Sequence, residues 1–157
     1  MDKSRSDEAY IRIALKEAVK AQEKGEVPVG AIIIKEGEII SKAYNRPLSL
    51  SDPTAHAEIL AIRRACRKLN NYRLNGCILY VTLEPCAMCL GAMIQARISR
   101  LVFGAKDPKG GAVESIISFP LEKLNHSFEI RGGVLAEECG KILVDFFKAK
   151  RENKSFE

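Results

Sequence analysis

The sequence of 157 residues contains no apolar run long enough to cross a bilayer, which takes about 20 residues. Its first residues are polar, and no apolar segment of the kind found in secretory leaders follows them. Internal repeats, low-complexity tracts and linker-like stretches are missing as well. We therefore expect a soluble cytoplasmic protein without membrane contact, folded as a single domain over residues 1–157.

Histidine and cysteine are both scarce, with two His and five Cys in the chain. An odd number of cysteines without a secretory leader argues against a disulfide framework, and a reducing compartment keeps thiolates available for a metal. Cys66, Cys77 and Cys139 stand singly in apolar patterns, so we interpret them as small buried residues. The other two cysteines stand close together.

That pair lies in the segment Pro85-Cys86-Ala87-Met88-Cys89. At a spacing of i and i+3 on a starting helix, the two sulfurs turn to one side and come close enough to share a metal ion. Pro85 favours a helix start, where free amides and the helix dipole stabilise thiolates. Alone, the motif is ambiguous among structural zinc, a redox dithiol and chance.

His56 resolves part of this ambiguity, because it supplies a third ligand beside Cys86 and Cys89. Three protein ligands with an open fourth position are typical of catalytic zinc, whereas structural zinc closes with four. The only other histidine, His126, lies in a separate stretch, and we interpret it as an exposed or capping residue.

Glu58 stands two positions after His56, at the start of a helical pattern. Within a helix the two side chains would point to nearly opposite sides, but at the first turn both reach a metal beyond the helix end. A carboxylate beside metal-activated water suits a general acid and base. We predict one Zn²⁺ per subunit, no organic cofactor, and Glu58 as the catalytic proton carrier. A structural zinc module is the alternative, and it leaves Glu58 without a role.

His56-Ala57-Glu58 followed by Pro85-Cys86-Ala87-Met88-Cys89 resembles the signature of zinc-dependent nucleobase deaminases. Further stretches resemble bacterial tRNA adenosine deaminases and together span nearly the whole chain: Val27-Pro28-Val29-Gly30-Ala31, Asn45, Thr54 to Glu58, Thr82 to Cys89, Phe103-Gly104-Ala105-Lys106-Asp107, and Phe146-Phe147. The resemblance implies conversion of the wobble adenosine of a tRNA anticodon stem-loop to inosine. It also implies a cytidine-deaminase-like fold and a homodimer in which the second subunit shapes the active site.

The resemblance implies that Asn45, Ala57 and Asp107 bind the substrate. A turn-forming asparagine would explain Asn45 equally well, and a plain turn would explain residues 107–112. After Ala112 the chain reads Val113-Glu114-Ser115, where the family usually has glycine before serine, so the path of this loop is not predicted.

Basic residues form two clusters, one on the first metal-binding helix and one at the C-terminal end beside Phe146 and Phe147. Basic side chains beside aromatic rings suit an RNA loop, because cations bind phosphates and rings stack on unpaired bases. A solvated helix face would explain the first cluster equally well, and at least one of the two phenylalanines is expected in the core. The net charge of +5 permits a polyanionic partner without requiring one. The RNA contacts predicted are Lys106, Phe146, Phe147, Lys148, Lys150 and Arg151. A metabolic deaminase of free guanine, cytosine or a nucleotide remains the alternative, and it has no need of a basic aromatic tail.

The apolar pattern predicts an α/β protein with three layers, in which helices flank a five-stranded mixed sheet. Helices are expected at 6–24, from the His56 segment to about 69, at 87–96 and at 134–150. Strands are expected at 29–35, 38–44, 77–83, 99–104 and 128–131, with a loop at 45–53. We expect Ser6 to cap the first helix and Gly25 to end it. The buried stripe predicted for the second helix is Ile59, Ile62, Ala65, Cys66 and Leu69.

Overall fold

Five strands form one mixed sheet in the order β2-β1-β3-β4-β5 in the computed structural model, which describes residues 3–154. Strand β1 (Gly30–Lys35) runs antiparallel to both β2 (Glu38–Tyr44) and β3 (Cys77–Leu83). Strand β4 (Arg100–Ala105) is parallel to β3, and the short β5 (Glu129–Arg131) is parallel to β4. The predicted five-stranded mixed sheet is confirmed.

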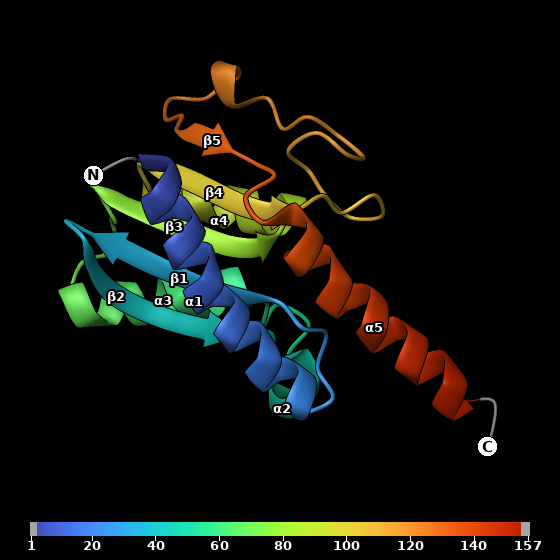
Figure 1. The fold of residues 1–157 in the computed structure, drawn as a ribbon. Coiled ribbons are helices and arrows are strands. Elements are labelled where there is room, and N and C mark those ends of the chain that lie inside the picture. The colour runs from blue at the N-terminus through green and yellow to red at the C-terminus, as the bar shows by residue number, and fades with distance from the viewer. Residues whose placement is uncertain (1–2, 155–157) are drawn as a thin grey trace.

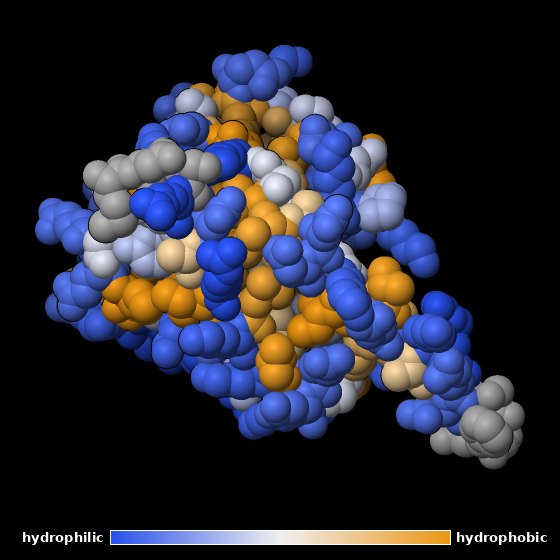
Figure 2. All heavy atoms as spheres, in the orientation of Figure 1, coloured by the Kyte–Doolittle hydropathy of each residue, from blue (hydrophilic) through white to orange (hydrophobic). Residues whose placement is uncertain are grey.

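Helices cover both faces of this sheet, so the predicted three-layer arrangement is also confirmed. Helices α1 (Lys3–Glu23) and α5 (Ala136–Lys154) lie on one face, and α3 (Ala57–Leu69) and α4 (Ala87–Ala96) lie on the other (Figure 1). On the first face, Figure 2 shows apolar side chains gathered between α1 and α5, while polar side chains cover the far end of α5. Among the described helices, none combines the length and the apolar character of a membrane span.

The alternation of side chains along β1 connects the two layers of the core. Ile32 and Ile34 pack with α1, whereas Ala31 and Ile33 pack on the side of α3 and α4. Both faces are therefore buried, which is why the strand reads as a continuous apolar run. Gly30 lets α1 approach the sheet closely, because a Cβ atom there would collide with the backbone of Ala14.

Several details differ from the predictions. Helix α1 begins before Ser6, so Ser6 lies inside it and does not cap it. The segment predicted as a loop contains a short helix, α2 (Pro47–Leu50). Ala57, Ala61 and Ala65 form the buried side of α3, whereas most of the predicted stripe is only partly buried. These alanines recur every four residues and let the helix approach the sheet closely, and this contact decides the buried side.

Another difference concerns His126, which is neither exposed nor a helix cap. It is half-buried, its Nε2 lies 2.7 Å from the carbonyl oxygen of Ile98, and its ring lies 6.1 Å from that of Phe128. Among the single cysteines, Cys77 and Cys139 are buried as predicted, but Cys66 is only partly buried.

Candidate active site

Two helix N-termini meet at one rim of the sheet and bring together the three predicted metal ligands. His56 is the N-cap residue of α3 and Cys86 is the N-cap residue of α4, both with extended backbone, while Cys89 lies buried in the first turn of α4. His56 Nδ1 lies 3.7 Å from Cys86 Sγ and 3.6 Å from Cys89 Sγ. The three ligand atoms all lie within 4.8 Å of one another.

These separations fit a tetrahedral zinc ion. Zinc bonds of about 2.05 Å to nitrogen and 2.3 Å to sulfur, opened at the tetrahedral angle, place the two ligand atoms about 3.6 Å apart. In the described part of the chain, no other cluster of His, Cys, Asp or Glu was found that could hold a metal. A three-ligand set leaves one position for water or substrate.

The two thiols of this set differ in their proton affinity. A hydrogen bond from the Cys89 thiol, outweighing burial, lowers the pKa of Cys86 to about 4, and His56 contributes to the same shift. The pKa of Cys89 is raised, because its thiol is hydrogen-bonded to Cys86 and is buried. The site therefore favours one thiolate at Cys86, and a divalent cation held there would favour deprotonation of the second thiol.

Glu58 lies in the first turn of α3 with only 4% of its surface exposed. Burial raises the pKa of its carboxyl to about 7, and the neighbouring His56 opposes this shift only in part. The charge of a bound cation would lower that pKa again. A carboxyl whose pKa lies near neutrality takes up and releases protons readily, as a general acid and base must.

A pocket of about 190 Å³ opens above these side chains. Its lining is made up of Val27, Val29, Asn45, His56, Glu58, Leu83, Glu84, Cys86 and Asp107. Sequence reasoning had named Asn45, His56, Glu58, Cys86 and Asp107 for this site, but neither Glu84 nor the apolar walls, because an apolar residue next to a strand looks the same in sequence whether it lines a pocket or fills a core.

The predicted substrate-binding residues have defined partners. Asn45 Oδ1 accepts the Ala57 N–H at 2.8 Å, so it caps α3 across the loop, and its NH₂ group keeps two N–H donors for a ligand. Ala57 itself lies in the core. Asp107 lines the pocket, and its Oδ1 also accepts the N–H groups of Lys109 and Gly110, which makes the plain turn that the sequence allowed.

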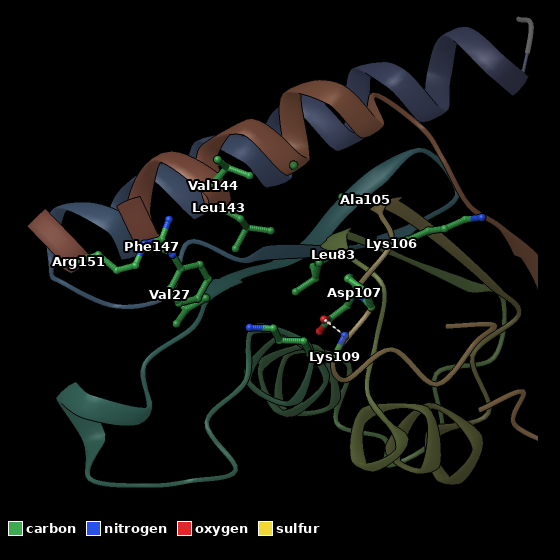
Figure 3. A pocket seen from close by; sticks show the side chains of 12 residues that line it. Val27, Leu83, Ala105, Lys106, Asp107, Lys109, Leu143, Val144, Phe147 and Arg151 are labelled. Carbon is green, nitrogen blue, oxygen red and sulfur yellow. Dashed lines mark hydrogen bonds between the residues drawn. The ribbon is translucent and has the colours of Figure 1, made fainter. Parts of the chain in front are cut away.

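A larger cavity of about 590 Å³ adjoins this pocket and shares Val27, Leu83 and Asp107 with it. Figure 3 shows Phe147 and Arg151 of α5 at one end of it and Lys106 at the opposite end, with the Lys106 side chain directed away from α5. Three of the predicted RNA contacts, Lys106, Phe147 and Arg151, thus line the same cavity.

The other predicted contacts lie outside this cavity. Phe146 is 7% exposed and belongs to the core, as expected for at least one phenylalanine of the pair, and the Lys150 ammonium lies 5.2 Å from its ring centroid. Lys148 and Lys150 are exposed on α5.

A mixed five-stranded sheet that carries a His-Cys-Cys set and a buried glutamate at its rim defines a nucleobase deaminase. In agreement, the family model described as MafB19-like deaminase matches residues 5–151. The tRNA-specific adenosine deaminase of Bacillus subtilis is 49% identical over 149 residues, which cover 94% of this chain and 92% of that protein. That of Aquifex aeolicus is 54% identical over 147 residues, covering 93% of this chain and 97% of that protein. The chain therefore belongs to the family of tRNA-specific adenosine deaminases.

Two solved structures place this family membership in context. One, from a study of A-to-I editing by tRNA:A34 deaminases at the wobble position, is 47% identical with a TM-score of 0.83 and covers 86% of this chain and 99% of that one. Guanine deaminase from Bacillus subtilis is 35% identical with a TM-score of 0.61, covering 76% of this chain and 84% of that one.

Proposed function

We propose that this protein hydrolyses the wobble adenosine of a tRNA anticodon loop to inosine and ammonia. The observation that carries this proposal is the tetrahedral spacing of His56 Nδ1, Cys86 Sγ and Cys89 Sγ beside the buried carboxyl of Glu58. The high identity to tRNA-specific adenosine deaminases over nearly their full length selects adenosine in tRNA as the substrate.

His56, Cys86 and Cys89 would hold one zinc ion per subunit, which would supply a Lewis acid that makes water nucleophilic near neutral pH. Glu58 takes the proton of this water and passes it to a ring nitrogen of adenine, which makes the adjacent C6 electrophilic. After attack at C6, Glu58 takes the remaining proton of the new hydroxyl group and gives it to the amino nitrogen, so that ammonia leaves as the C6 carbonyl forms. Asn45 and Asp107 orient the nucleotide in the pocket, and the apolar walls exclude bulk water.

The anticodon loop extends from this pocket into the larger cavity, where Phe147 offers a flat surface for a base and Lys106 and Arg151 offer charges for phosphates. Lys148 and Lys150 on α5 add charge along the same path. The pocket of about 190 Å³ accepts a base only after it has been turned out of its stack. Turning a base outward costs less free energy in a loop than in a duplex, so a loop is the better substrate. We further propose that residues 1–157 act as one domain and that two copies of the chain form the enzyme.

Guanine deaminase is the second candidate, because the Bacillus subtilis enzyme of that name has a similar fold. Ammonia release decides between the two when it is measured on matched substrates. These are an anticodon stem-loop with adenosine at the wobble position, the same stem-loop with guanosine there, and free adenosine, guanine and cytosine. We expect turnover of the first alone. Rapid deamination of a free base, with no deamination of either stem-loop, would contradict the RNA-editing function and support a metabolic deaminase of free bases.

The metal assignment has its own test. Metal analysis of the purified protein should find one zinc per chain, and Cys86→Ala should lose both the metal and the activity. Cys66→Ala, a partly buried cysteine outside the site, should keep both. An active preparation without metal would contradict the assignment.

A further inference from the structure

Glu84 is a buried carboxylate that the deamination chemistry does not use. It follows β3 directly, is 2% exposed and forms part of the pocket wall. Five hydrogen bonds converge on it from one loop: the backbone N–H groups of Asp107, Val113, Glu114 and Ser115 at 3.0 to 3.1 Å, and the Ser115 hydroxyl at 2.5 Å.

The loop formed by residues 107–115 wraps around this side chain. Gly111 passes so close that a Cβ atom there would collide with the Glu84 carboxyl group, and the Ala112 N–H donates to the Pro85 carbonyl at 2.9 Å. The loop contains neither a helix nor a strand, so much of its hydrogen bonding is directed to this one carboxylate. The Glu84 carboxylate therefore holds this loop in place through hydrogen bonds to its backbone.

This loop and the residue before it carry polar side chains that line the two cavities. Asp107 lines both cavities, and Lys106, just before it, lines the larger one and forms an ion pair with Glu114 at 3.3 Å. Because Glu84 binds the backbone of both Asp107 and Glu114, it fixes the two ends of this arrangement at once.

We infer that Glu84 is a positioning residue for the nucleotide substrate: it holds the 107–115 loop so that Lys106 and Asp107 meet the anticodon loop. This inference rests on the proposed function for its substrate. Glu84 therefore governs substrate affinity and leaves the chemical step at Glu58 unchanged. A role in fold stability alone would leave the affinity of the folded enzyme unaltered.

Steady-state kinetics on the stem-loop separate these two roles. Glu84→Gln keeps the size of the side chain but turns one acceptor oxygen into a donor that faces backbone N–H groups. We expect KM to rise by about tenfold or more, as the loss of hydrogen bonds to a charged acceptor predicts, with kcat within about twofold and zinc content unchanged. Ser115→Ala, an exposed change that removes one of the five bonds, should raise KM less.

Asp7→Asn is the matched control, because Asp7 is a fully buried carboxylate in α1, on the other face of the sheet from α3 and α4. It should lower the melting temperature and leave KM unchanged. If Glu84→Gln behaves like this control, with a lower active fraction and an unchanged KM, the positioning role is overturned.

Amide hydrogen exchange of the zinc-loaded protein tests the same contact without any substrate. Glu84→Gln should speed exchange at residues 113–115 and leave α3 unchanged. Unchanged exchange at these amides would overturn the inference even if the wild type edits RNA. A wild type that is inactive on the stem-loop would defeat the proposed function and still leave this measurement decisive for the loop.

Discussion

Buried carboxylates in this protein have different proton affinities because they have different partners. Hydrogen bonds from the Ser49 hydroxyl and the N–H groups of Ser49 and Leu48 outweigh burial at Glu26, so the pKa of that carboxyl is lowered. At Glu58 burial outweighs the hydrogen bonds from its own N–H and from the Cys89 thiol, and it raises the pKa to about 7. Burial alone therefore does not identify the proton carrier, whereas a carboxyl whose pKa is raised by burial beside a metal-ligand set is a candidate.

Replacing Glu58 tests this assignment at the scale of one residue. Glu58→Gln keeps the shape of the side chain but removes the proton transfer, so turnover should fall by about 10²–10⁴-fold while the zinc remains bound. Glu17→Gln is a matched control, since both glutamates are 4% exposed and Glu17 lies in α1 paired with Lys20. Metal analysis together with single-turnover kinetics measures both effects. A Glu58 variant with wild-type turnover would show that another group carries the protons.

At the scale of elements, the sequence predicts those helices and strands whose position is determined by a local residue pattern. The β-branched run Ile32 to Ile34 and the Pro-Cys-x-x-Cys start of α4 are local signals, and the structure places both elements as expected. Helix α2 was not predicted because its first turn is stabilised by Glu26, which accepts the N–H groups of Leu48 and Ser49. Glu26 lies far upstream, so the sequence around the helix does not indicate this contact. The 107–115 loop was not predicted for the same reason, since its bonds go to Glu84.

Helix α5 supports a prediction about RNA binding, because its two adjacent phenylalanines differ in burial. Phe147 is 43% exposed beside the larger cavity, whereas Phe146 is 7% exposed. Phe147→Ala should weaken stem-loop binding and preserve stability, while Phe146→Ala should cost about 3–5 kcal/mol of stability. Fluorescence anisotropy and urea unfolding measure the two quantities. Equal RNA affinity for wild type and Phe147→Ala would exclude stacking on this ring.

The charges of α5 predict how this binding depends on salt. Truncation after Phe147 removes Lys148, Lys150 and Arg151, so affinity should fall and its dependence on salt should flatten by about 0.7 in the logarithmic slope for each lost phosphate contact. The zinc content should stay the same, because α5 contributes no ligand of the described metal set. An unchanged slope would show that the tail does not contact RNA.

At the scale of the whole molecule, one buried ionic network joins segments far apart in the sequence. Asp7 of α1 receives hydrogen bonds from Tyr80 of β3 at 2.8 Å, from both terminal nitrogens of Arg100 of β4 at 2.8 Å, and from Arg131 of β5 at 2.6 Å. It therefore ties the first helix to three strands of the sheet. No local pattern around Asp7 announces this role, since each partner comes from a different element.

This network predicts how the stability of the fold depends on pH. Burial alone would raise the pKa of Asp7, but the hydrogen bonds from Arg100, Tyr80 and Arg131 outweigh it and lower the pKa from 3.8 to about 2. Because the folded state has the lower pKa, the ionised carboxylate stabilises the fold above pH values near 4, and this contribution is lost as the pH falls from about 5 to 2. A shift of this size corresponds to about 2 kcal/mol in the free energy of unfolding.

The measurement is the difference in unfolding free energy between wild type and Asp7→Asn, taken by urea titration across this pH range. Acid also releases zinc when its ligands are protonated, but both proteins share that loss, so it cancels in the difference. The difference should be largest at neutral pH and shrink as the solution becomes acidic, because a protonated aspartate and an asparagine are both neutral. A difference that stayed constant down to pH values near 2 would mean that packing around residue 7, and not its charge, holds α1 to the sheet.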